Sequence, residues 1–222
     1  MDIVLYGIFV IVGYLGWLVC WSDSLEDLPK PKSFFQLGSL ANFLLVAVSF
    51  FVMGQTTIFA ASVNANLYSE VSPPLALPVL DMNRSASILE LTLRFLKLLL
   101  FEDMPRIGIY LLALYVSTKF FSPSTSVFIS LVLSSFCFAL IHGFDLSLTI
   151  QAAFVGAILT LVGLRYGVAM SAFLHVALNH FKIGVFFPGF AAGTNIFLGI
   201  FLNSTWVYVL WSSLFWPKLR RE

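Results

Sequence analysis

Charged residues are scarce in this chain. Of its 222 residues only 10% are Asp, Glu, Lys or Arg, whereas 59% are hydrophobic, and the mean hydropathy is +0.96. Soluble domains carry about 25% charged and about 45–50% apolar residues, so this composition excludes an ordinary water-soluble domain. The net charge of +1 also excludes the clustered basic face that marks a nucleic-acid partner. The composition therefore predicts a polytopic protein embedded in a lipid bilayer.

Cysteine is nearly absent, since Cys20 and Cys137 are the only two. Both lie within or at the edge of apolar runs, so a disulfide framework is not expected. The first residues, Met1-Asp2-Ile3, lack the basic region that opens a signal peptide, and Cys20-Trp21-Ser22-Asp23 does not resemble a cleavage site. We expect the first apolar segment to remain in the protein as a membrane anchor.

Apolar runs near the ~20 residues that cross a bilayer recur along the whole chain. Short linkers rich in proline or charge separate them and discourage regular structure. The runs are Ile3–Trp21, Phe34–Ala61, Glu102–Phe121, Ser126–His142, Leu146–Arg165, Val168–Phe187 and Thr194–Trp216. The sequence thus predicts an all-α bundle of about seven spans, one integral-membrane domain over residues 1–222, and a multi-pass location in the plasma (inner) membrane.

The stretch Ser85–Leu100 differs from the other apolar segments. Glu90, Arg94 and Lys97 make one charged stripe on a helix that is otherwise rich in Leu and Phe. Such an amphipathic helix prefers the interface plane of a bilayer. With this helix lying flat, the positive-inside rule favours an N-terminus outside the membrane.

Ionisable side chains inside apolar segments usually face a protein interior or a wet cavity and mark function. The first such cluster is Glu102-Asp103-Met104-Pro105-Arg106, and two of the three histidines, His142 and His175, form the others. Glu102 and Arg106 are four residues apart, a spacing that predicts an ion pair on one helix face.

The two histidines also belong to polar helix faces. Residues four apart share a face, so each histidine helix is predicted to carry a polar stripe. One stripe is Ser130, Ser134, Phe138 and His142, and the other is Ser171, His175 and Asn179.

A carboxylate, two imidazoles and a carboxamide are the groups that hydrolysis of a peptide by water requires. The carboxylate takes a proton from water as general base, and the other groups donate hydrogen bonds to the developing oxyanion. Glu102, His142 and His175 could instead hold a metal such as zinc with an open water position. We expect no obligatory metal, because a carboxylate paired with arginine is a weakened ligand and the chain has no HExxH pair.

The order of these motifs resembles the CAAX protease and bacteriocin-processing family of intramembrane endopeptidases, whose pattern is EExxxR, FxxxH and HxxxN/B. Phe138…His142 matches the second motif and His175…Asn179 the third. The resemblance covers a catalytic core of about residues 100–181, roughly Leu100–Phe181. It implies a peptide or membrane-anchored protein as substrate.

The first motif departs from the family pattern. With Arg106 held in register, the family's first glutamate falls on Phe101 and its second on Glu102. With the acidic pair held in register, Glu102-Asp103 replaces Glu-Glu and one residue is missing before Arg106. Both alignments remain open at this point.

The resemblance implies a role for each motif residue. Glu102 activates water, His142, His175 and Asn179 bind and polarise the peptide carbonyl, and Arg106 supports the glutamate. Asp103 is a reserve carboxylate, and Phe138 packs beside the site. The alternatives are a non-catalytic relative that acts as a membrane scaffold or partner-binding protein, and a proton-coupled carrier, for which buried Glu and His are equally suited.

Overall fold

The computed structural model describes residues 3–19, 28, 42–50, 52–53, 88–142, 146–181 and 196–219. Within these ranges the regular structure is helical and no strand occurs, which confirms the all-α prediction. Apart from residue 28, the linkers 22–33 and 62–85 lie outside the described residues, as does much of the expected span 34–61.

The described helices lie within or close to the expected spans, with bounds that differ by a few residues. Residues 42–50 are also helical. The others are α1 (Ile3–Leu18), α3 (Ile88–Leu98), the π-helical turn η2 (Leu99–Asp103), α4 (Met104–Ser117), α5 (Pro123–Leu140), α6 (Leu146–Tyr166), α7 (Val168–Phe181) and α9 (Ile196–Leu219).

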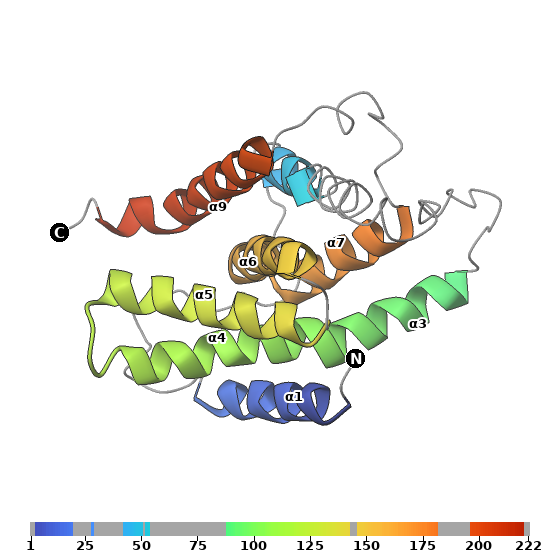
Figure 1. The fold of residues 1–222 in the computed structure, drawn as a ribbon, viewed down its shortest axis with the longest axis horizontal. Coiled ribbons are helices and arrows are strands. Elements are labelled where there is room, and N and C mark those ends of the chain that lie inside the picture. Colours follow the sequence, from blue (N-terminus) through green and yellow to red (C-terminus); the bar gives the residue numbers. More distant parts are fainter. Residues whose placement is uncertain are drawn as a thin grey trace.

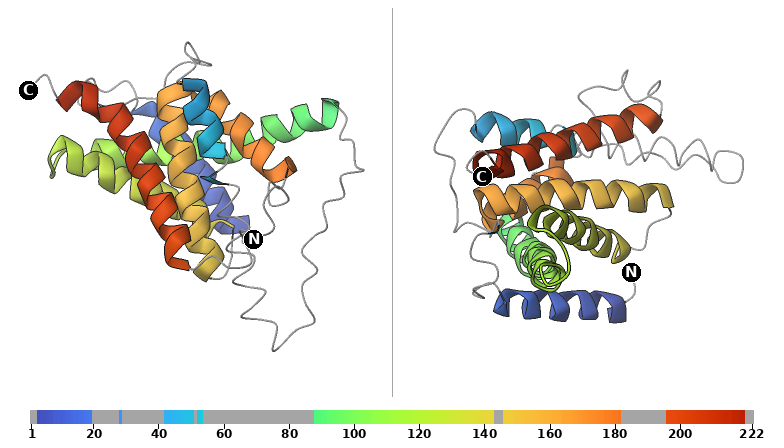
Figure 2. Two further views of the ribbon diagram at one scale, coloured as in Figure 1. Left: turned by 90° about the horizontal axis from the view of Figure 1, so that it is seen from above. Right: turned by 90° about the vertical axis from the view of Figure 1, so that its left-hand side faces the viewer.

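The helices stack in layers, with α6 near the middle of the molecule (Figure 1). α6 packs against α5, α7 and α9, while α4 packs against both α5 and α1. Figure 2 shows α1 on one outer side of the stack and α9 with the helical residues 42–50 on the opposite side. α7 also contacts η2, and Phe138 of α5 contacts His175 of α7, so side chains from η2, α5 and α7 meet inside the stack.

One continuous helical segment runs from Ile88 to Ser117. Leu98 and Asp103, which stand at its two junctions, both have right-handed helical dihedral angles. The sequence pattern separates an interfacial helix from a span that starts at Glu102, whereas the structure joins the two through η2. Pro105 is tolerated because it lies in the first turn of α4.

The helix α5 has its polar side inward and its apolar side outward. Ser126, Ser130 and Ser134 are fully buried, while Phe128 and Phe136 are 59% and 49% exposed. Water would favour the opposite arrangement, and large exposed apolar faces mark contact with a partner or a membrane. The surface of α5 therefore matches a lipid environment.

Among the residues that the structure describes, two helices are long and apolar enough to cross a bilayer, namely α5 and the 149–166 part of α6. α1 and residues 168–179 of α7 are apolar but shorter. These helices weakly suggest a membrane protein, and the count of about seven spans stays a prediction.

α1 and α4 cross with their backbones in direct contact. A Cβ atom on Gly16 would overlap the carbonyl group of Gly108, and a Cβ atom on Gly13 would overlap the backbone of Pro105. Small residues at a crossing allow this close approach, which is a common way for helices to associate in membranes.

Replacing Gly108 with alanine should lower the free energy of unfolding by about 1–3 kcal/mol, because its Cβ atom would overlap the Gly13 carbonyl group. Gly7→Ala on α1 is the matched control, since a Cβ atom there would meet nothing within 4 Å. Thermal unfolding in detergent measures both. Equal melting temperatures for the two variants would contradict the close crossing.

Two further glycines shape the core around α6. A Cβ atom on Gly156 would lie 2.9 Å from Cδ1 of Phe138, so α6 approaches α5 closely at that level. Gly167 has a φ of 99°, a left-handed conformation that favours glycine, and this single residue joins α6 to α7. The tight connection fixes where α7 begins relative to the core.

Candidate functional site

A cluster of carboxylates and imidazoles lies where three parts of the chain meet. The turn η2 supplies Glu102 and Asp103. The residues just after α5 supply His142, and α7 supplies His175. Positions 102 and 175 are far apart in the sequence, so the packing of α7 against η2 is what brings them together.

Glu102 faces both histidines. Its Oε2 atom is 3.7 Å from Nε2 of His142 and 3.8 Å from Nε2 of His175. The Glu102 side chain is only 13% exposed. The structure thus places one carboxylate between the two imidazoles that the sequence pattern singled out.

The other ring nitrogen of each histidine is held by an acceptor. Nδ1 of His175 is 3.1 Å from Oδ2 of Asp103, and Nδ1 of His142 is 2.8 Å from the carbonyl oxygen of Phe138. A carboxylate or carbonyl oxygen accepts only, so each Nδ1 carries a proton and donates. This arrangement orients both Nε2 atoms toward Glu102, as a partner on one nitrogen of a functional histidine commonly does.

Asp103 forms the buried part of the cluster. Its side chain is fully buried, and Oδ1 accepts hydrogen bonds from Nη2 of Arg106 at 2.5 Å and from Oγ of Ser171 at 2.7 Å. Arg106 Nη2 also donates to Ser171 Oγ at 2.7 Å. Pairing and hydrogen bonding of this kind are what make a buried charge tolerable.

Phe138 packs against the cluster as the sequence analysis expects. Its ring centroid lies 4.6 Å from that of His142 and 5.6 Å from that of His175, both edge-on. The Arg106 guanidinium carbon lies 5.1 Å from the same ring centroid. Phe138 therefore contacts both imidazoles and the guanidinium group of Arg106.

The observed ion pair differs from the expected one. Arg106 pairs with Asp103, three residues earlier, instead of Glu102, four residues earlier. Both spacings place two side chains on one helix face, so the sequence could not choose between them. The difference leaves the Glu102 carboxylate directed at the histidines.

Three other residues that the sequence singled out lie at different distances from the cluster of carboxylates and imidazoles. Phe101 is 46% exposed and lies outside the cluster. Asn179 is exposed near the end of α7, and within the described residues it makes no hydrogen bond with the acidic pair or the histidines. Ser171, which the sequence analysis placed only on the polar face of α7, is fully buried and part of the cluster. Ser171 lies four residues before His175 and so on the same helix face, and this spacing was the sequence signal that could have placed it in the cluster.

Within the described part of the chain no group of three His, Cys, Asp or Glu side chains is arranged to hold a metal ion. Glu102 and the two Nε2 atoms come closest to such a set.

Replacing Ser171 with alanine should lower the free energy of unfolding by about 1.5–3 kcal/mol, the range for hydrogen bonds to charged groups, because Asp103 and Arg106 both lose a buried partner. Ser134→Ala is the control, since the Ser134 hydroxyl donates only to the carbonyl of Leu131 in its own helix. Chemical denaturation followed by circular dichroism measures both. A Ser171→Ala protein as stable as the control would contradict this role.

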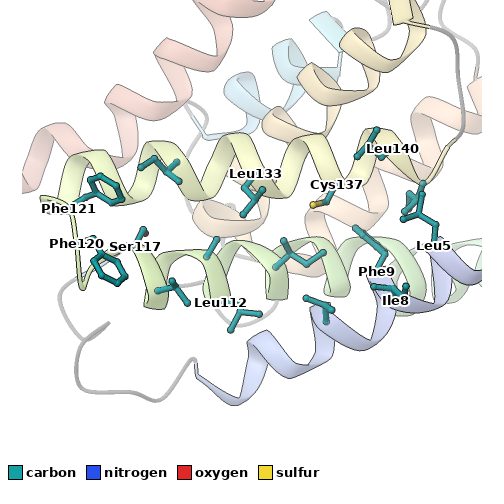
Figure 3. A pocket seen from close by; sticks show the side chains of 16 residues that line it. Leu5, Ile8, Phe9, Leu112, Ser117, Phe120, Phe121, Leu133, Cys137 and Leu140 are labelled. Carbon is teal, nitrogen blue, oxygen red and sulfur yellow. The ribbon is translucent and has the colours of Figure 1, made fainter.

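An apolar groove of about 510 Å³ lies between α1, α4 and α5 (Figure 3). Its lining includes Leu5 and Phe9 of α1, Leu112 of α4, and Leu133 and Cys137 of α5. Ile141 lines it too, next to His142 in the sequence. The groove therefore begins close to the cluster and extends along α4 and α5.

Comparisons of the chain with protein-family models, with curated proteins and with solved structures find no match.

Proposed function

We propose that this protein is an intramembrane endopeptidase, a hydrolase of the CAAX-protease-like kind. The observation that carries the proposal is the position of the Glu102 carboxylate between the Nε2 atoms of His142 and His175, in a largely buried site. We propose that one water molecule binds between these three groups, within reach of the carboxylate that would take its proton.

In the proposed reaction Glu102 takes a proton from water, and the water oxygen attacks the carbonyl carbon of the scissile peptide bond. A histidine that carries protons on both ring nitrogens donates from Nε2 to the oxyanion that forms, and Asn179, one helical turn after His175, is proposed to add a further donor. The carbon–nitrogen bond then breaks, and the leaving amine receives the proton that Glu102 took. Low exposure of the site strengthens each of these electrostatic effects.

The arrangement supports the alignment in which Glu102-Asp103 replaces the Glu-Glu pair of the family. In this alignment Glu102, which faces the histidines, takes the role of the water-activating carboxylate, and Asp103, which pairs with Arg106, takes that of the second carboxylate. Phe101, the alternative for the first position, is 46% exposed.

The proposed setting is a multi-pass protein of the plasma (inner) membrane with about seven spans. The outward apolar face of α5 and the length of α5 and α6 support this setting. A substrate anchored in the membrane is supported by the apolar groove, which would accept aliphatic groups near the cluster.

The test compares membranes that contain the wild-type protein with membranes that contain Glu102→Gln. Mass spectrometry of protein termini should find new N-termini only with the wild-type protein. Identical termini in both membranes would overturn the proposal, and would favour the non-catalytic scaffold if the variant also kept its cellular function.

A further inference from the structure

Two side chains of α1 donate hydrogen bonds to the backbone around the acidic pair. The Tyr14 hydroxyl donates to the carbonyl oxygen of Leu100 at 2.7 Å. Nε1 of Trp17 donates to the carbonyl oxygen of Met104 at 2.8 Å. These two carbonyl groups lie on either side of Glu102 and Asp103, so α1 is bonded to both ends of the turn that carries the cluster's carboxylates.

The Leu100 carbonyl group has no backbone N–H that could bond it in the π turn. The Met104 N–H, its partner in a regular α-helix, bonds to the carbonyl of Leu99 instead. The next residue, Pro105, has no N–H. Tyr14 therefore supplies the donor that the backbone lacks.

The hydrogen bond from Tyr14 to Leu100 also favours the π-helical hydrogen-bonding pattern over the α-helical one. Without it, the carbonyl groups of Leu99 and Leu100 would compete for the single N–H of Met104. A bond to Leu100 would convert the π turn to an α turn, which removes one residue from the turn. Such a register change rotates neighbouring side chains by about 100° relative to α4, and would turn Glu102 away from the histidines.

The glycine crossing makes these contacts possible. Gly13 and Gly16 flank Tyr14 and precede Trp17 on α1, and their lack of Cβ atoms lets α1 approach Pro105 and Gly108. At that separation a phenol and an indole from α1 reach the carbonyl groups of the neighbouring helix. Close packing and hydrogen bonding therefore act on the same turn.

We propose that Tyr14 and Trp17 are positioning residues, which hold η2 in its π-helical form so that Glu102 faces His142 and His175. The expected effect on catalysis rests on the proposed function. The expected effect on how Glu102 faces His142 and His175 does not. α1 is thus a functional part of the site.

The experiment uses the full chain in lipid nanodiscs with ¹⁵N-labelled histidine rings, assigned through single His→Gln variants. The test protein is Tyr14→Phe with Trp17→Phe, which removes one hydroxyl and one indole N–H. The matched control is Tyr166→Phe with Trp206→Phe, because the Tyr166 hydroxyl donates to Asn42 and the Trp206 N–H to Ser49, away from the cluster. The Glu102→Gln variant shows how the histidine ring signals move when the carboxylate of residue 102 is lost.

We expect the ring nitrogen signals of His142 and His175 to move in the test protein in the same direction as in Glu102→Gln, and to stay in place in the control. For a cleaved substrate, kcat should fall about 10- to 100-fold with KM unchanged. Unchanged histidine signals in a folded test protein, and in each single variant, would overturn the proposal. Moved signals without peptidase activity in the wild type would support the positioning role and overturn the proposed function.

Discussion

Replacing Arg106 with methionine should lower the free energy of unfolding by about 3–5 kcal/mol, the cost of breaking a buried ion pair by removing one partner. Asp103 and Arg106 are both fully buried, so the remaining carboxylate would have no cation in place of the guanidinium. Ser171 and His175 would still donate to it, but neither is a permanent charge. Denaturation by guanidinium or urea, followed by tryptophan fluorescence, measures the loss.

Two further variants make this prediction specific. Arg94→Met removes the arginine of an exposed pair with Glu90, which should cost at most about 1 kcal/mol. The double variant Asp103→Asn with Arg106→Met removes both buried charges, and should be more stable than Arg106→Met alone. A double variant that is less stable than the single one would contradict the uncompensated charge as the cause.

Replacing Glu102 with glutamine should reduce the cleavage rate at least about 100-fold, the usual minimum contribution of a general base. The change keeps the size of the side chain and removes its ability to take a proton. Because Glu102 lies 3.7 Å and 3.8 Å from the two imidazoles, its environment suits a base better than that of Asp103, which is already bonded to Arg106 and Ser171. The rate is measured with a substrate identified by the comparison of protein termini.

Glu90→Gln is the control for this variant, since Glu90 lies on the exposed part of α3. Its cleavage rate should equal that of the wild type. A Glu102→Gln protein that cleaves at the wild-type rate would show that another group activates the water.

Much of the cluster could be predicted from the sequence because its members are rare. Ionisable groups inside apolar segments have few stable positions other than facing one another, so Glu102, His142 and His175 were natural neighbours. The structure brings these three together. The all-α architecture was predictable for a similar reason, since long apolar runs without strand alternation favour helices.

The ion pair of Arg106, the π turn and the bond from Tyr14 leave no comparable pattern in the sequence. The partner of Arg106 was predicted wrongly because residues three and four apart are both neighbours on a helix. The π turn depends on which backbone carbonyl the Met104 N–H bonds, and its only trace in the sequence is Pro105. The bond from Tyr14 to Leu100 spans 86 residues and ends on a carbonyl group that every residue possesses. Such contacts are decided by how helices pack.

The short spacing of Asp103 and Arg106 has a consequence for biogenesis. Since the two residues are three apart on one helix, their ion pair forms without help from any other segment. In the proposed membrane setting, the nascent segment 103–117 would therefore enter the bilayer with this one ion pair already formed, before residues 168–181 are synthesised. His175 and Ser171 then dock onto a preformed acidic partner, and the last helix of the cluster is selected by a site that the earlier one brought into the membrane.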